Sequence, residues 1–280
     1  MLVLVRRVDE GLDRAMAYIN SIAPDRIRCV HLGTPSRSLA AAFWARYGKE
    51  VVFESAAKGL VRSARAAVHA MHSRHPDRTL AVVIPEVIEA SKWWHVLRHN
   101  RALRLKAALL FEREVVVVNV PTVPADETMI LRTVRRHVVV VPVAGVHAGT
   151  RDALTFARLL QPTEMRAVHI AGITDDADAV ARAWRDAEVP IALEIIPSPL
   201  REVAAPLRAV VESIRDDGAD IVTVVIGEVV PRWYQQGLHN HHALAIKRRL
   251  LFEPGVAVAS VSSEVERKAA PDVTFSGSRL

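Results

Sequence analysis

Residues 93–121 read WWHVLRHNRALRLKAALLFEREVVVVNVP, and residues 232–262 read RWYQQGLHNHHALAIKRRLLFEPGVAVASVS. Both stretches contain tryptophan, a His-Asn pair, an Ala-Leu pair, a lysine and Leu-Leu-Phe-Glu, and both end in a valine-rich run. A repeat of this length does not arise from composition alone, and internal repeats mark duplicated structural units. The chain is therefore predicted to contain two copies of one fold.

A second pair of matching stretches defines the extent of the repeat. Residues 17–31 read AYINSIAPDRIRCVH and residues 155–169 read TFARLLQPTEMRAVH, an offset of 138, whereas Phe111 and Phe252 are 141 apart. The copies therefore differ by a few inserted residues. The predicted domains are a first unit at 1–121, a linker at 122–136, a second unit at 137–262 and a disordered polar tail at 263–280.

Short apolar runs alternate with helical stretches inside each copy. Continuous Val/Ile runs are typical of parallel strands covered on both faces, and strand–helix alternation makes a doubly wound sheet. The predicted strands are 2–5, 27–32, 51–54, 80–84 and 115–120, then 138–143, 165–170, 191–196, 221–226 and 256–261. The predicted helices are 10–22, 38–47, 58–75 and 100–111, then 150–160, 176–187, 200–216 and 240–252. The predicted fold class is α/β, with two tandem doubly wound parallel five-stranded sandwiches, strand order 3-2-1-4-5, packed as a pseudo-dimer.

Composition narrows the class of protein. The net charge of +6 attracts anions such as nucleotides, acidic lipid headgroups or nucleic acid, or it reflects an Arg-rich solvated surface. The single cysteine, Cys29, excludes an intrachain disulfide and fits a reducing cytosol. The sequence shows neither a signal-peptide apolar region nor an apolar run near the roughly 18 residues that cross a bilayer. A soluble cytoplasmic protein is predicted, without a nucleic-acid partner because the basic residues are not interleaved with aromatics.

Ligands of open α/β sheets bind beyond the carboxyl ends of the strands, where the strand order reverses. In the predicted order this point lies between the first and fourth strands of each copy. The repeated stretch begins in the loop after strand four and continues into a helix whose N-terminus can hold an anion. The candidate ligand-binding residues are Asp9, Glu86, His99, Asn100, Lys106, Gly149, Thr150, Glu228, His239, Asn240 and Lys247.

Each of these candidates also has a structural interpretation. Asn100 and Asn240 are in the positions of helix N-caps, a role that asparagine favours. Lys106 and Lys247 lie about two turns into the helix, as solvated stems or as anion contacts. The His-Asn pair is displaced by one residue between the copies, so the lysine and the helix are the firmer part of the match.

The remaining candidates lie near the first and fourth strands. Glu86 and Glu228 follow strand four and either hydrogen-bond a ribose or a neighbouring chain, or lie in a solvated turn. Asp9 follows the first strand and can reach a base or ribose. Gly149 and Thr150 can open a helix toward a phosphate, although two glycines near a helix start are weak evidence.

Aromatic and histidine clusters leave further alternatives open. The tryptophans Trp93, Trp94 and Trp233 can stack a base, or they can form an interface, where aromatic residues are enriched. The histidines His239, His241 and His242 lack a cysteine or carboxylate at a ligand spacing, so no metal site is predicted. P-loop, G-x-G-x-x-G and G-x-S-x-G motifs are missing from the sequence, which predicts a protein without catalytic activity.

The repeated segment resembles a known protein family. HNHHALAIKRRLLFEPGVAVASV at 239–261 resembles the cytosolic C-terminal domain of bacterial APC-superfamily transporters, the amino-acid and potassium permease group, and residues 99–121 are a shortened version. AYINSIAPDRIRCVH and the VVIPE at 82–86 resemble the same domain, which looks like a universal stress protein fold. The resemblance covers roughly 1–121 and 138–262.

The resemblance implies a regulatory module that partners a transporter membrane domain in cis or in trans. In potassium importers of this superfamily such domains dimerise and bind cyclic di-AMP. Two departures are that the chain carries no membrane span, and that IPEVIEASKWW at 84–94 and IGEVVPRWYQQ at 226–236 replace the glycine-rich stretch of ATP-binding universal stress proteins.

The sequence therefore predicts a non-catalytic cytosolic sensor. It would bind an adenine nucleotide, cyclic di-AMP or ATP, at the strand edge, control a transporter and self-associate through its sheets. An interaction or scaffold module, a free-standing universal stress protein without a transport role and a nucleotide-hydrolysing enzyme are the alternatives.

Overall fold

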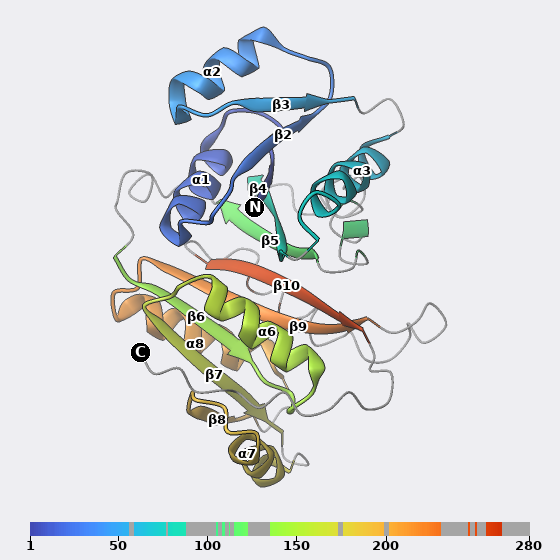
Figure 1. The fold of residues 1–280 in the computed structure, drawn as a ribbon. Helices are drawn as coiled ribbons and strands as arrows, with labels where there is room; N and C mark the ends of the chain where they lie inside the picture. The colour runs from blue at the N-terminus through green and yellow to red at the C-terminus, as the bar shows by residue number, and fades with distance from the viewer. Residues whose placement is uncertain are drawn as a thin grey trace.

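A computed structural model describes most of the chain. It covers residues 1–55, 59–76, 78–87, 105, 108–109, 112, 115–122, 135–172, 176–198, 202–230, 246, 250 and 256–264. The described strands form one ten-stranded sheet in the order β3-β2-β1-β4-β5-β10-β9-β6-β7-β8 (Figure 1). Each half has the order 3-2-1-4-5, which confirms the predicted doubly wound topology.

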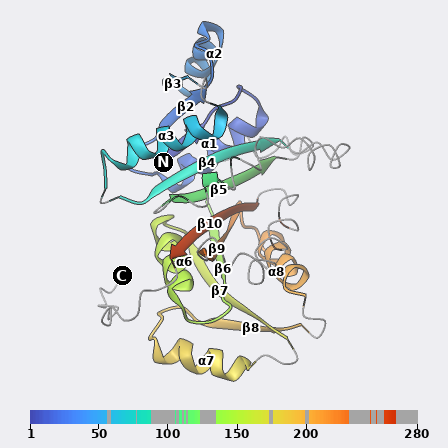
Figure 2. The ribbon, with the colours of Figure 1, turned by 90° about the vertical axis from the view of Figure 1, so that its right-hand side faces the viewer.

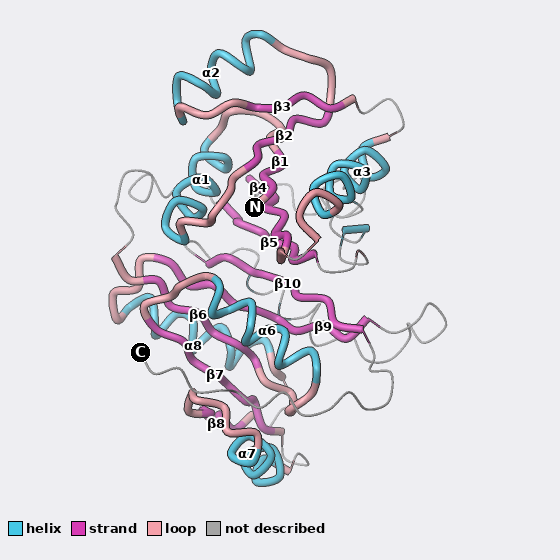
Figure 3. Tube along the Cα trace, viewed as in Figure 1, coloured by secondary structure: helices cyan, strands magenta, loops and turns pink. Residues whose placement is uncertain are grey.

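The elements of the two halves follow one another in the same sequence. The first half contains β1 (Leu2–Leu4), α1 (Glu10–Ile22), β2 (Arg28–Leu32), α2 (Arg37–Tyr47), β3 (Val51–Glu54), α3 (Leu60–His72), β4 (Leu80–Val87) and β5 (Val115–Thr122). The second contains β6 (His137–Pro142), α6 (Ala148–Leu159), β7 (Glu164–Ala171), α7 (Ala177–Asp186), β8 (Leu193–Pro197), α8 (Ala204–Asp216), β9 (Ile221–Val230) and β10 (Val256–Glu264). Figure 3 shows the strands running through the centre with helices on both sides.

Some element ends differ from the predicted ones. The strands β4 and β9 continue three and four residues beyond the predicted ends at 84 and 226, and β10 runs through Glu264, three residues past the predicted end at 261. Of the predicted helices at 100–111 and 240–252, the structure describes a few residues, all helical: Leu105, Ala108, Leu109, Ile246 and Leu250.

The two halves are joined edge to edge by the antiparallel pair β5 and β10. Asn119 pairs with Val258, Val118 with Ala259, and Val117 with Ser260. Because equivalent residues of the two strands are 141 apart, Val118 and Ala259 are equivalent to each other and lie at the centre of the pair. A local two-fold axis therefore passes through this point, perpendicular to the sheet. The pseudo-dimer is built around it.

Helices cover the two faces of the sheet differently. One core contains Leu12 and Ile19 of α1 together with Leu154 of α6, and it is continuous across both halves. On the opposite face, α3 and α8 pack over two separate cores, one in each half. Figure 2 shows α6 and α8 on opposite sides of the strands of the second half. The shared core on the α1–α6 face therefore ties the halves together beyond the β5–β10 pairing.

A small polar cluster lies inside this shared core. The ring of His137 at the start of β6 meets the ring of Tyr18 edge-on, with centroids 6.1 Å apart, and its Nε2 is hydrogen-bonded to Thr223 Oγ1 at 2.8 Å. All three side chains are buried. Burial lowers the pKa of His137 to about 4 and raises the pKa of Tyr18 to about 12, so both groups are neutral at pH 7.

An ion pair with a buried carboxylate fixes α2 against α1. Asp13, 7 % exposed, accepts hydrogen bonds from Arg46 Nη2 at 2.5 Å and from the Tyr47 hydroxyl at 2.7 Å. The Arg46 side chain is half exposed, and its pKa is raised mainly by its hydrogen bond to Asp13. Removing the arginine therefore leaves a buried carboxylate without its cation.

We expect Arg46→Met to lower the free energy of unfolding by about 2 kcal/mol, somewhat less than for a fully buried pair because water can reach the vacated position. Arg78→Met is the matched control, since Arg78 pairs with Asp25 at 3.2 Å in a pair whose carboxylate side chain is 86 % exposed. That exposed pair contributes about 0.5 kcal/mol or less. Urea unfolding of the variants measures both values, and equal losses would contradict the structural role of Asp13.

Among the described residues, no helix combines the length and the apolar character needed to cross a membrane. Within the same residues, no group of three or more His, Cys, Asp or Glu side chains is arranged to hold a metal ion.

Candidate functional site

Each half of the sheet has a carboxyl edge where its strand order reverses, between β1 and β4 in the first half and between β6 and β9 in the second. The halves are joined by antiparallel strands, so these two edges point in opposite directions. One small ligand cannot span both edges of one chain. The chain therefore carries two separate candidate sites.

A histidine lies at equivalent positions in the two halves, in β2 and in β7, near the carboxyl ends of β1 and β6. His31 Nδ1 is 2.9 Å from the carbonyl oxygen of Val5, and His169 Nδ1 is 2.8 Å from the carbonyl oxygen of Val143. Since a carbonyl can only accept, Nδ1 is the hydrogen-bond donor in both rings. The residues of both pairs are 138 apart, the offset of the sequence repeat. The duplication has thus preserved a contact that holds the residue directly after the first strand.

The start of α1 is shaped by a carboxylate. Asp9 Oδ1 accepts a hydrogen bond from Leu12 N–H at 3.1 Å, and Asp9 is ion-paired with Arg7. This cap satisfies one of the free N–H groups and places a negative charge at the positive end of the helix dipole. A phosphate at this helix start would meet the Asp9 charge, so Asp9 is suited to contact a base amino group or a ribose hydroxyl.

The start of α6 has a different, neutral cap. His147 Nδ1 accepts a hydrogen bond from Thr150 N–H at 3.3 Å, and burial lowers the pKa of His147. The Thr150 hydroxyl donates to the carbonyl of Gly145 at 2.6 Å, and Thr150 is 3 % exposed. Both polar groups of Thr150 are therefore engaged inside the protein in this structure.

Gly149 is used for close packing. An ideal Cβ built on Gly227 of β9 would lie 2.1 Å from the Gly149 carbonyl oxygen. The missing side chain of Gly227 thus allows the Gly149 backbone of α6 to approach β9 closely. A phosphate-binding role for Gly149 and Thr150 stays a prediction, and the observed contacts assign both residues a packing role.

The two candidate glutamates occupy equivalent positions inside strands. Glu86 pairs with Pro121 in the β4–β5 ladder, and Glu228 pairs with Ser262 in the β9–β10 ladder. Pro121 and Ser262 are themselves equivalent at the offset of 141. The expected turn position was wrong for both residues, because the ladders continue past them, and Glu228 is 3 % exposed rather than solvated.

The other predicted site residues lie outside the described residues. They are His99, Asn100, Lys106, His239, Asn240 and Lys247, together with the tryptophans Trp93, Trp94 and Trp233. The structure therefore describes the β1 and β6 sides of the two edges and the last residues of β4 and β9.

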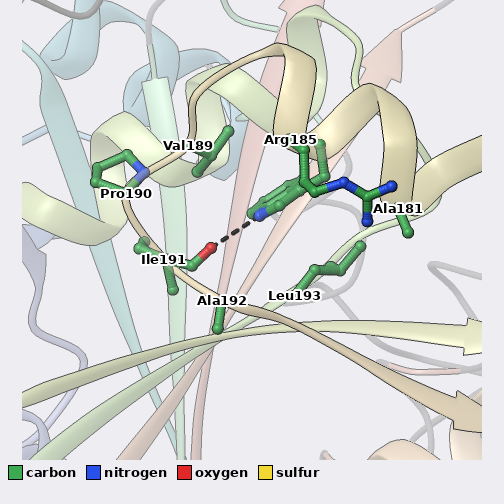
Figure 4. A pocket seen from close by; sticks show the side chains of 8 residues that line it. Ala181, Arg185, Val189, Pro190, Ile191, Ala192 and Leu193 are labelled. Atoms are coloured by element: carbon green, nitrogen blue, oxygen red, sulfur yellow. Dashed lines mark hydrogen bonds between the residues drawn. The ribbon is translucent and has the colours of Figure 1, made fainter.

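A cavity of about 350 Å³ lies away from both edges, between α7 and β8 (Figure 4). Trp184 Nε1–H donates to the Ile191 carbonyl at 2.8 Å, and Val189, Pro190 and Leu193 add apolar walls. Arg185 lies at its border. Of the predicted ligand residues that the structure describes, none lines this cavity.

The family of the chain follows from its two matching segments. The family model of the KimA potassium transporter C-terminal domain matches residues 1–122 and 135–263, which include both halves of the sheet. The chain belongs to this family. The match confirms the resemblance to transporter C-terminal domains.

Solved structures share the fold at low sequence identity. A functionally unknown protein of Pseudomonas aeruginosa PAO1 superposes with a TM-score of 0.54 at 11% identity, covering 93% of this chain and 92% of that one. A universal stress protein of Archaeoglobus fulgidus DSM 4304 gives a TM-score of 0.51 at 10% identity, covering 93% and 96%. No curated protein sequence matches the chain significantly. These likenesses confirm a universal stress protein-like fold.

The sequence predictions missed the histidine pair and the cap of α6. His31 and His169 close the two stretches AYINSIAPDRIRCVH and TFARLLQPTEMRAVH, so the repeat itself contained the evidence. His147 lacks a counterpart of its own type, because Asp9 caps the equivalent helix.

Proposed function

We propose that this chain is the cytosolic regulatory module of a potassium transporter, that it is non-catalytic, and that it binds an adenine nucleotide, cyclic di-AMP or ATP, to control transport. Membership of the KimA C-terminal domain family is the observation that carries the regulatory part. The partner is then a transporter membrane domain, in cis or in trans.

The nucleotide part is supported by the two carboxyl edges. Both halves keep a histidine bonded to the residue directly after the first strand and a glutamate near the end of the fourth strand. This is the place where doubly wound sheets hold ligands. The first half presents the Asp9 carboxylate there, an acceptor for the amino group of adenine or for a ribose hydroxyl.

The opposite directions of the two edges constrain the stoichiometry. A mononucleotide such as ATP would bind each edge separately. Cyclic di-AMP carries two equivalent adenines, so a single molecule that engages two edges must bridge two chains. Nucleotide-dependent association of the chain is therefore expected for cyclic di-AMP and not for ATP.

The first test is calorimetry of the purified chain with cyclic di-AMP, ATP and AMP, combined with analytical ultracentrifugation. We expect saturable heat with at least one of the three nucleotides. The absence of heat with all of them at high protein concentration would overturn the nucleotide proposal and leave the family assignment intact.

Asp9→Asn tests the role of the first edge. Asparagine caps helices about as well as aspartate, so the fold is kept while the carboxylate is lost. We expect nucleotide affinity to fall by about tenfold, the equivalent of one charge-assisted hydrogen bond. Asp176→Asn is the matched control, since Asp176 caps α7 through Ala179 N–H at 2.8 Å and also pairs with an arginine. Equal affinities of the two variants would exclude Asp9 from the site.

A further inference from the structure

The outward face of α3 and the first residues of the turn after it are basic, and Asp77, which follows them in the sequence, lies outside the described residues. Residues 59–76 contain three arginines, three histidines and no carboxylate. Arg62, Arg65 and His69 are spaced by three and four residues and therefore form one stripe along the helix. The side chains of Arg65 and His69 are 51% and 64% exposed.

Further basic residues lie after the helix and in the loops that precede β2 and β4. Arg26 Nη1 lies 3.3 Å from His75 Nε2, and Arg78 pairs with the exposed Asp25. We call this surface the basic patch, and its members are Arg26, Arg62, Arg65, His69, Arg74, His75 and Arg78.

Two carboxylates face the basic patch from neighbouring elements. Glu112 is buried and forms an ion pair with Arg65, and its Oε2 lies 2.9 Å from His69 Nε2. Asp25 forms an ion pair with Arg78. Among the residues that the structure describes here, five arginines against two carboxylates leave a positive surface before any histidine is protonated. Arg62 and Arg74 have no ion pair among the residues that the structure describes.

The duplicated fold supplies an internal comparison for this charge. The helix α8 takes the place of α3 in the second half, with the same length of 13 residues and the same packing role. Residues 203–220 contain two arginines and four carboxylates, namely Arg208, Arg215, Glu212, Asp216, Asp217 and Asp220. The two windows thus carry net charges of opposite sign, with Arg136, just before β6, paired with Asp217 of the second window, so packing does not require the charge of α3.

We propose that the basic patch is a docking surface for an anionic phospholipid membrane. Arginines spread along a helix and a sheet edge fit the negative potential of a lipid surface, which acts on all of them without a specific pocket. The membrane repels the acidic α8 surface of the second half, so the two signs orient the module with α3 toward the lipid. This proposal rests on the proposed transporter role, which places the module next to a membrane.

The docking is weak on its own and effective when tethered. Each cation near an anionic surface raises membrane partitioning by about fivefold, so three net charges give about a hundredfold. A hundredfold increase in membrane partitioning is modest for a freely diffusing protein. A domain held beside the bilayer by a membrane partner has a local concentration in the millimolar range, where such an affinity suffices.

The test is flotation of the full chain with vesicles of phosphatidylglycerol and phosphatidylcholine in equal parts, at low ionic strength. We expect flotation with these vesicles, none with pure phosphatidylcholine, and loss of binding as salt shortens the screening length to about 10 Å at 0.1 M. The double variant Arg62→Glu/Arg74→Glu is expected to bind at least about 30-fold more weakly.

The control variant Arg185→Glu/Arg215→Glu changes the net charge equally on α7 and α8 and should float as the unmodified chain does. Equal losses in both double variants would show that net charge, and not the basic patch, drives binding, and would overturn the proposal. Absence of flotation at any salt would also overturn it.

Two further measurements distinguish a membrane from two other possible occupants of the basic patch. Binding to polyglutamate without binding to vesicles would replace the membrane by an acidic protein segment. Self-association at low salt without lipid, abolished by the α3 double variant, would replace it by the acidic half of a second copy. Failure of flotation leaves nucleotide calorimetry unaffected, and failure of calorimetry leaves flotation unaffected, so the two proposals fail separately.

Discussion

Gly227→Ala is expected to lower the free energy of unfolding by about 3 kcal/mol or more, at the upper end of the cost of overpacking a core. The new Cβ would lie 2.1 Å from the carbonyl oxygen of Gly149 and 2.6 Å from its carbonyl carbon. Both atoms belong to backbone that cannot rotate away, so α6 must lift from β9. That movement would open the core that the two halves share. Chemical denaturation followed by circular dichroism measures the loss.

Gly145→Ala is the matched control for this prediction. A Cβ there would meet His147 Cδ2 at 3.9 Å, an ordinary van der Waals contact. Its effect should stay within about 0.5 kcal/mol, as for most substitutions in open positions. Losses of the same size in both variants would show that α6 does not approach β9 at backbone distance.

Gly33→Ala falls between these two cases. Its Cβ would lie 2.7 Å from His31 Nε2, which is a side-chain atom. The ring can yield, but it would then give up its bond to the Val5 carbonyl, the contact repeated in both halves. We expect a loss of about 1 kcal/mol, the net value of one hydrogen bond, measured by the same denaturation series.

The strands nearest the junction of the two halves were predictable from the sequence because they are rich in valine. The runs at 115–120 and 256–261 are buried on both faces of the sheet, so no polar alternation interrupts the pattern. The predicted ends failed where a charge lies inside a strand. The run at 221–226 was expected to end before Glu228, but the β9–β10 ladder continues to the pair Glu264 and Val230. A neighbouring strand, which the local sequence does not reveal, keeps this backbone extended.

The joining of the two halves could not be read from local patterns. A repeat predicts two similar units, but such units can pack through the faces of their sheets or pair through their edge strands. The observed edge pairing depends on the register of β5 and β10. The two residues of its central pair, Val118 and Ala259, are separated by 141 positions in the sequence. The contact between Gly227 and Gly149 likewise links residues of two elements far apart in sequence.

The candidate site was predicted in its position more than in its chemistry. The strand order confirmed that the edges between β1 and β4 and between β6 and β9 are the reversal points. Thr150 proved to be bonded within its own loop, because a neutral histidine took the capping position. Side chains that cap a helix and side chains that bind an anion are chosen for the same property, the ability to pair with free N–H groups, and sequence alone does not separate them.

Acidification is expected to weaken the protein through His137. Its pKa in the folded state is lowered to about 4 by burial, from an ordinary value of 6.5. Between these values the unfolded chain binds a proton that the folded chain does not, so stability falls as the pH drops through 6.5 and levels off below 4. The shift corresponds to a loss of up to about 3 kcal/mol. Above pH 6.5 this contribution is fully present.

The variant His137→Gln isolates this contribution from that of the carboxylates. Glutamine can keep a hydrogen bond to Thr223 but does not titrate, so the difference in unfolding free energy between wild type and variant should shrink by about 3 kcal/mol from pH 7 to pH 4. His75→Gln is the control, because His75 lies at the surface beside Arg26 and does not reach the shared core. A constant difference across this range for His137→Gln would mean that the ring is not held neutral between the two halves.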